Sequence, residues 1–153
     1  MTLYLVRHAK AGEREAWEGD DDLRPLSKGG HKQAAAIATL FDDLPVARVL
    51  SSPAVRCRQT VEPIAAQRRL PLEPAEELAE GTPLPDVLRL VEKTLWGDTI
   101  LCTHGDVIAD LLTHLDRAGV SLDEELRLEK GSTWLLDVRD GEIVSGRYIA
   151  PPR

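Results

Sequence analysis

Two arginines and two histidines carry the chemistry that this sequence suggests. Arg7 and His8 follow a first short apolar run, Arg56 follows a second, and His104 with Gly105 follows a third. Guanidinium groups pair bidentately with phosphate oxygens, and histidine can act as a nucleophile. No carboxylate stands at these positions to neutralise the positive charge. Brought together, these side chains would suit a phosphoryl dianion, and the start of a helix at Gly105 would add backbone N–H donors.

The positions of these residues depend on alternating strands and helices. Three short apolar runs predict buried strands at residues 2–6, 46–50 and 99–103. The spacing of apolar residues predicts helices over 27–41, 53–68, 84–95 and 108–115. A hairpin is expected from 132–138 and 142–149 around Asp140-Gly141, and loops are expected at 12–24 and 71–81.

This order of elements predicts an α/β fold, a three-layer sandwich with a mostly parallel central sheet. Ligands bind such sheets beyond the carboxyl ends of the strands, which would bring the arginines and histidines to one place. The chain has 153 residues and no internal repeat, so residues 1–153 are expected to form one domain.

Composition excludes several other classes of protein. A formal net charge of −7 disfavours general binding to nucleic acid or to an anionic membrane, although it allows a local cationic pocket. No apolar run is long enough to span a bilayer, and residues 1–6 lack the features of a signal peptide. Two cysteines make no disulfide framework, which favours the cytoplasm.

Two other kinds of phosphatase site are not supported. A cysteine phosphatase needs an arginine six residues after its cysteine, but Ile108 stands six after Cys102 and Pro63 six after Cys57. The four histidines have no recognisable zinc spacing, so neither a metal nor another cofactor is expected.

Four segments together resemble the histidine phosphatase superfamily, which has the phosphoglycerate-mutase-like fold. Residues 5–9 resemble its R-H-G/A signature, and residues 24–27 with Gly29 resemble its L-[ST]-x-x-G stretch. Residues 51–60 resemble S-S-P-x-x-R-x-x-Q-T, and Thr103-His104-Gly105 looks like the second histidine motif. The chain is similar to the short SixA-type phosphohistidine phosphatases. It is more similar still to the phosphatase domain fused to a Nudix domain in actinobacterial MutT-type hydrolases. The chain has no Nudix box, so a stand-alone version is expected.

The resemblance implies roles for the four residues. His8 would attack phosphorus and form a covalent phosphohistidine, which water would then cleave. Arg7, Arg56 and His104 would bind the phosphoryl oxygens, and Gly105 would contribute at the helix N-terminus. No metal is needed, because the positive charges belong to the protein.

A general acid is expected in the acidic loop. The family pattern has a glutamate after a leucine there, which Leu78-Ala79-Glu80 fits; Glu76 and Glu77 are rivals, and Asp106 could also face the site. Arg24 could bind phosphate, but pairing with Asp21 is favoured.

Three functions stay open at this stage. The first is a phosphatase acting on a small phosphomonoester or a nucleotide, and the second is a phosphatase acting on a phosphohistidine protein. The third is a non-catalytic module that binds a phosphorylated ligand, which the presence of both histidines disfavours. The sequence does not determine an oligomeric state.

Overall fold

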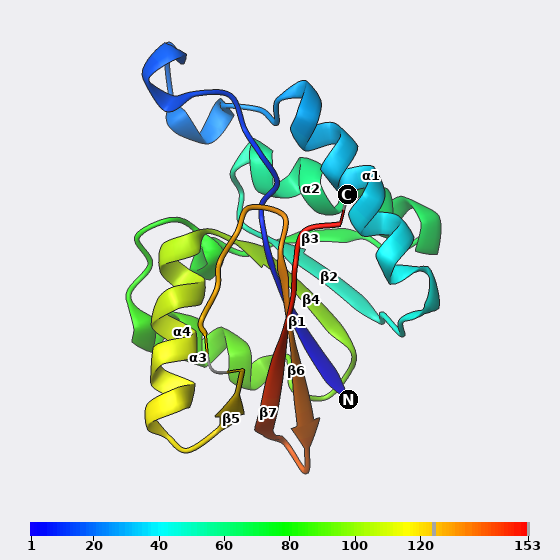
Figure 1. The fold of residues 1–153 in the computed structure, drawn as a ribbon, viewed down its shortest axis with the longest axis vertical. Coiled ribbons are helices and arrows are strands. Elements are labelled where there is room, and N and C mark those ends of the chain that lie inside the picture. The colour runs from blue at the N-terminus through cyan, green and yellow to red at the C-terminus, as the bar shows by residue number, and fades with distance from the viewer. Residues whose placement is uncertain (124, 153) are drawn as a thin grey trace.

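The computed structural model describes residues 1–123 and 125–152, and within them one mixed sheet is covered by helices on both faces (Figure 1). The sheet has seven strands in the order β3-β2-β4-β1-β6-β7-β5. Their bounds are β1 Thr2–Arg7, β2 Arg48–Ser51, β3 Leu72–Pro74, β4 Thr99–Thr103, β5 Ser121–Leu122, β6 Thr133–Arg139 and β7 Glu142–Ile149. The helices are α1 Lys28–Leu40, α2 Val55–Arg68, α3 Leu84–Lys93 and α4 Gly105–Arg117. The predicted α/β sandwich is therefore confirmed.

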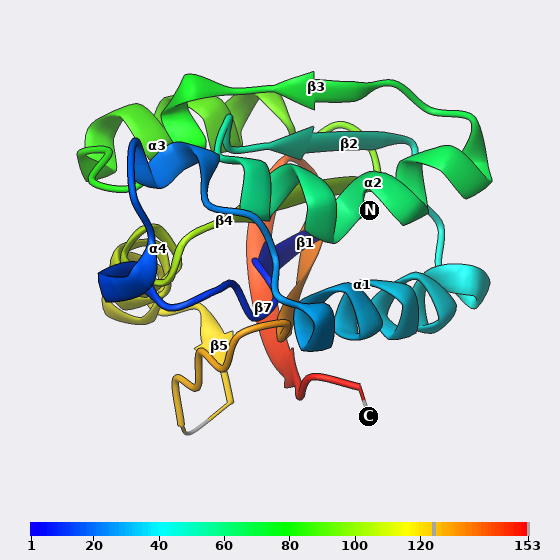
Figure 2. The same ribbon diagram turned by 90° about the horizontal axis from the view of Figure 1, so that it is seen from above.

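Side chains of successive β1 residues lie on opposite faces of the sheet and belong to two separate layers of the core. Leu3 and Leu5 pack with residues of α3 and α4, whereas Tyr4 and Val6 pack with residues of α1 and α2. Figure 2 shows the two pairs of helices on opposite sides of the strands. Every residue of β4 is buried, as expected for a central strand covered on both faces.

The strands that precede the site are neighbours and run in the same direction. β4 pairs in parallel with β1 on one side and with β2 on the other. Their carboxyl ends consequently meet at one edge of the sheet. The segment after β1 projects beyond this edge, at the top of Figure 1, and includes the short 3-10 helices η1 (Arg14–Ala16) and η2 (Asp21–Leu23).

The predicted elements are present, with a few corrections. The hairpin β6–β7 turns at Asp140 and Gly141, which both have positive φ. Pro53 lies two residues before α2, which begins at Val55. The segment 71–81, expected as a loop, contains β3 and the 3-10 helix η4 (Glu76–Leu78), because β3 adds to the edge of β2. The two-residue strand β5, which pairs with β7, was not predicted.

Close packing at the start of α1 requires a glycine at Gly30, and not at Gly29, which the sequence motif had indicated. Ser27 caps the helix by accepting a hydrogen bond from the Gly30 N–H at 3.1 Å. A Cβ on Gly30 would lie 1.9 Å from the Lys10 carbonyl oxygen, whereas the nearest atom to a Cβ on Gly29 is 3.8 Å away. The segment after His8 can pack on α1 only because Gly30 has no side chain.

Gly30→Ala should destabilise the protein by about 1–3 kcal/mol or more, because backbone must move to admit the methyl group. Gly29→Ala is the matched control and should stabilise by roughly 0.5–1 kcal/mol, since alanine favours a helix over glycine. Urea unfolding of the two variants and the wild type measures both effects. Equal stability of the two variants would show that the close contact at Gly30 is not a constraint.

Candidate active site

Arg7, His8, Arg56 and His104 lie together at the carboxyl edge of the sheet. Arg7 ends β1, Arg56 lies in the first turn of α2, and His104 is the residue before α4. The rings of His8 and His104 are 5.4 Å apart between centroids and meet edge to face. The sequence thus correctly anticipated that three strand ends would bring these four side chains together.

The His8 ring is fixed in one orientation. Its Nδ1 lies 2.8 Å from the Ala9 carbonyl oxygen. A carbonyl only accepts hydrogen bonds, so Nδ1 carries the proton and Nε2 keeps its lone pair. Ala9 is held in turn by Thr60, whose hydroxyl accepts a hydrogen bond from the Ala9 N–H at 2.9 Å. When the ring is neutral, this geometry leaves the lone pair of Nε2 free.

The surroundings of His8 disfavour its protonation. Burial is the main cause that lowers the pKa of His8 from 6.5 to about 3. The hydrogen bond to Ala9 acts in the opposite direction, while His104, Arg56 and Arg7 lower the pKa further. His8 is therefore neutral, and able to attack an electrophile, throughout the physiological pH range.

His104 is held between α2 and β2. Its Nε2 is hydrogen-bonded to the Ser52 hydroxyl at 2.9 Å, and its Nδ1 lies 3.5 Å from Nη2 of Arg56. A guanidinium group can only donate, so Nδ1 is the acceptor in this contact. Cys57 Sγ is also 3.5 Å from Nε2, and both cysteines are fully buried.

Arg7 lies against the first residue of α4. Its Nη1 donates to the Leu128 carbonyl, and its Nε has no hydrogen-bond partner among the described residues. A Cβ on Gly105 would be 2.9 Å from the Arg7 Cζ atom. Gly105 is therefore needed for the guanidinium group to reach the N-terminal end of α4.

The expectation that no carboxylate neutralises the cluster is wrong. The fully buried Arg56 pairs through Nη2 with Asp21 at 3.2 Å and with Glu80 at 3.3 Å. Its Nη1 donates to the Asp21 carbonyl oxygen at 2.8 Å. The reason is tertiary: the segments that contain Asp21 and Glu80 fold over α2, and a buried cation needs such partners. Asp21 also pairs with Arg24 at 2.9 Å, as predicted.

The acidic candidates occupy different places. Glu80 contacts both Arg56 and, at 3.1 Å, Arg14 of η1, and it lines the cavity above His8. Asp106 lines the same cavity, where it accepts a hydrogen bond from the Gly81 N–H at 2.8 Å. Glu76 and Glu77 line a separate cavity beside α3. Glu80 is thus the glutamate of this loop that faces the four-residue cluster.

The cavity above the cluster has a volume of about 780 Å³ and is lined by charged side chains of both signs. The cationic ones are Arg7, Lys10, Arg14, Arg24 and Lys130, the acidic ones are Glu13, Glu15, Glu80 and Asp106, and His8 and His104 lie among them. Positive charge beside a neutral nucleophile is suited to a phosphorylated ligand. Among the described residues, no three His, Cys, Asp or Glu side chains are grouped as metal ligands.

Residues 3–82 match the Histidine phosphatase superfamily (branch 1). The chain belongs to the histidine phosphatase superfamily. It is 33% identical over 156 residues to an 8-oxo-(d)GTP phosphatase of Mycolicibacterium smegmatis. That alignment covers 99% of this chain but 48% of the relative, so the chain spans about half the length of this curated relative.

Solved structures of histidine phosphatases share the fold. A putative phosphohistidine phosphatase SixA from Agrobacterium tumefaciens superposes with a TM-score of 0.76 at 25% identity and covers 98% of both chains. The protein histidine phosphatase SixA complexed with tungstate also gives a TM-score of 0.76, at 20% identity, over 98% of this chain and 95% of that chain. These matches agree with the predicted phosphoglycerate-mutase-like architecture.

Several residues that shape this histidine phosphatase site were not predicted from the sequence. Ser52 and Thr60 lie inside the S-S-P to Q-T motif, and the motif therefore carried a signal for them. Arg14 and Lys10 gave no signal, because they stand in segments without regular spacing.

Among the described residues no helix is long and apolar enough to cross a membrane.

The lowered pKa of His8 predicts a loss of stability in acid. Between pH 6.5 and about 3 the unfolded chain binds a proton on this ring that the folded protein refuses. From pH 7 to pH 5 the wild type should lose about 2 kcal/mol of unfolding free energy relative to His8→Gln, which cannot titrate. Urea unfolding at both pH values measures the difference. Parallel pH dependences would mean that His8 is readily protonated in the folded protein.

Proposed function

We propose that this chain is a metal-independent phosphatase that transfers a phosphoryl group to His8 and then to water. The main observation is that His8 lines the cavity as a neutral ring whose proton lies on Nδ1, which donates to the Ala9 carbonyl oxygen, so that the Nε2 lone pair is free. Covalent catalysis of this kind divides one difficult displacement into two easier ones. Membership in the histidine phosphatase superfamily supports the same chemistry.

The surrounding donors would stabilise the charge of the transition state. In this proposal Arg7, Arg56 and His104 bind the phosphoryl oxygens, and the Gly105 N–H adds a donor at the start of α4. His104 would donate from Nδ1 in the tautomer in which Ser52 donates to Nε2, after Arg56 turns from Nδ1 to the ligand. Each such preorganised donor is worth on the order of 2–4 kcal/mol. Because the cations are part of the chain, the mechanism requires no metal ion.

The substrate in this proposal is a nucleotide or another small phosphorylated molecule. Support comes from the relative named as an 8-oxo-(d)GTP phosphatase and from the cavity of about 780 Å³ beside His8. A phosphohistidine protein is the second candidate, favoured by the match at 25% identity to a putative SixA. The proposal further treats residues 1–153 as one catalytic unit. It also places the protein in the cytoplasm, because its two cysteines are buried and free rather than joined in a disulfide.

Glu80 is proposed as the general acid for poor leaving groups. It contacts Arg56 and Arg14. A phosphoryl dianion would compete for these guanidinium groups and free the Glu80 carboxyl group from them. The acid could then donate its proton to the leaving oxygen.

Removal of His8 tests the proposed function. His8→Ala should lower kcat by at least about 10⁴-fold, while His114→Ala, which changes an exposed histidine on α4, should keep wild-type activity. Acid-free quenching should leave labelled phosphate on the wild type and none on His8→Ala. EDTA should have no effect on turnover. Substantial activity in His8→Ala, or inactivation by EDTA that a divalent metal reverses, contradicts the mechanism.

Substitution of Glu80 should separate two kinds of substrate. Glu80→Gln should reduce kcat for alkyl phosphate monoesters by roughly 10²–10⁴-fold, because their leaving oxygen needs a proton. Nucleoside diphosphates and phosphohistidine have better leaving groups and should be affected much less. Measurement of kcat on both kinds of substrate decides the matter. An equal effect of Glu80→Gln on kcat for both kinds of substrate would show that Glu80 is not the general acid. Asp106 would then be the next candidate.

A further inference from the structure

Two lysines lie beside the nucleophile without having a role in the mechanism above. Lys10 is two residues beyond His8, and Lys130 precedes Gly131, whose N–H donates to the carbonyl oxygens of Arg7 at 3.2 Å and of His8 at 3.1 Å. Both lysines line the same cavity as His8. Backbone contacts thus keep two flexible cationic side chains at the mouth of the site.

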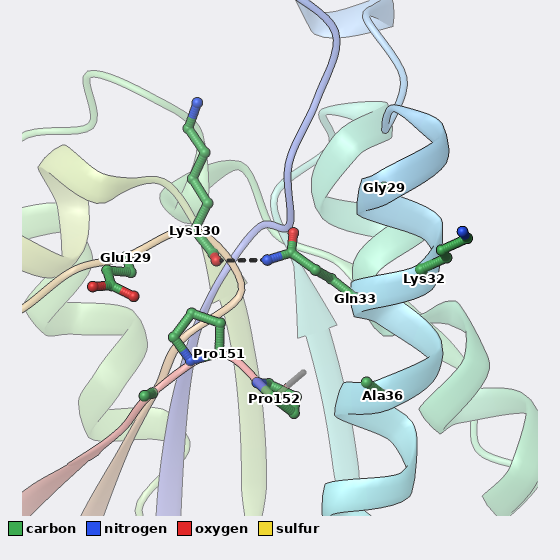
Figure 3. A pocket seen from close by; sticks show the side chains of 9 residues that line it. Gly29, Lys32, Gln33, Ala36, Glu129, Lys130, Pro151 and Pro152 are labelled. Atoms are coloured by element: carbon green, nitrogen blue, oxygen red, sulfur yellow. Dashed lines mark hydrogen bonds between the residues drawn. The ribbon is translucent and has the colours of Figure 1, made fainter.

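One amide group from α1 joins the two lysine segments. The Lys10 N–H donates to Gln33 Oε1 at 2.8 Å, and Gln33 Nε2 donates to the Lys130 carbonyl oxygen at 3.2 Å. Figure 3 shows this second hydrogen bond, with the Lys130 side chain pointing away from Pro151 and Pro152. Gln33 therefore fixes the relative positions of two segments that are distant in the sequence.

The backbone at Gly131 is adapted to this contact. Its φ is +84°, and a Cβ there would lie 3.2 Å from Gln33 Nε2. Any other residue would be strained in this conformation and would press against the amide group. The close approach of Lys130 to α1 consequently depends on a glycine.

The charges around the two lysines are predominantly positive. Neither lysine forms an ion pair with another described residue, in contrast to Arg14 and Arg24, which pair with Asp21. Burial lowers the pKa of Lys130, and nearby cations lower it further; these are Arg7, Arg24, Lys10 and Arg14. Five Lys and Arg side chains and four Asp and Glu side chains line the cavity, but among the described residues nearby carboxylates pair with Arg14 and Arg24 rather than with the two lysines. The unpaired lysine charges favour a second anionic group beside them.

We propose that Lys10 and Lys130, positioned by Gln33, form a subsite for a second phosphate group, so that the preferred substrates are phosphoanhydrides such as nucleoside di- and triphosphates. This inference rests on the proposed function and names its substrate class. The terminal phosphoryl group occupies the site of Arg7, Arg56 and His104, and the adjacent phosphate contacts the lysines.

The reaction on a nucleoside diphosphate follows from this arrangement. The Nε2 lone pair of His8 forms the N–P bond while the terminal phosphorus separates from the bridging oxygen. That oxygen keeps the electron pair and leaves on the nucleoside monophosphate, where Lys10 and Lys130 stabilise the added charge. Water then attacks phosphorus, the N–P bond electrons return to Nε2, and phosphate and a proton are released. Glu80 has no leaving oxygen to protonate in this reaction.

The test compares adenosine diphosphate with adenosine monophosphate in the presence of EDTA. Lys10→Gln and Lys130→Gln should each lower kcat/KM for the diphosphate about tenfold more than for the monophosphate, as expected for one lost charge-assisted contact. Lys32→Gln is the control, because it removes the same charge from the exposed face of α1 and should change neither value. Gln33→Leu should shift the same ratio in the same direction as the lysine variants.

Equilibrium binding keeps the subsite separate from catalysis. Imidodiphosphate should bind the wild type more tightly than orthophosphate does, and Lys130→Gln should remove most of that advantage. Lysine-dependent binding without any turnover would support the subsite and refute the proposed function. Turnover with an unchanged substrate ratio in both lysine variants, or an equal change in Lys32→Gln, would overturn the subsite and leave the phosphatase proposal intact.

Discussion

Burial of positive charge at one edge of the sheet is the constraint on which the rest of the site depends. Arg56 is fully buried, and a guanidinium group removed from water requires hydrogen-bonding partners or opposite charges. Asp21 and Glu80 supply them from two segments that have little regular structure of their own. The same contacts therefore hold these two segments over α2 at the edge of the sheet.

The burial that keeps His8, the proposed nucleophile, neutral also limits the stability of the protein in acid. A solvent-exposed imidazole would be partly protonated near neutral pH and would lose its lone pair. Burial prevents this, and the hydrogen bond to Ala9 decides which nitrogen carries the proton. Thr60 extends the arrangement to α2, so residues of the second motif determine the orientation of a side chain in the first.

Local and overall charge have opposite signs in this molecule. The chain carries a formal net charge of −7, yet the cations that line the cavity beside His8, five Lys and Arg side chains, outnumber its four Asp and Glu side chains. A net negative surface disfavours indiscriminate contact with polyanions, whereas the cavity concentrates positive potential where phosphate would react. In the proposed function, this separation would favour small phosphorylated ligands over nucleic acid.

The sequence by itself determined the four α-helices and the longer strands, because apolar spacing encodes burial directly, but it did not determine the short edge strands β3 and β5. It also determined the convergence of Arg7, His8, Arg56 and His104, since parallel neighbouring strands end at one edge. Only the tertiary structure decided which carboxylates neutralise Arg56, why the glycine at the start of α1 must be Gly30, and which amide joins Lys10 to Lys130. These contacts connect residues far apart in the chain, and their geometry depends on how irregular loops pack against helices. No periodic pattern in the sequence records that packing.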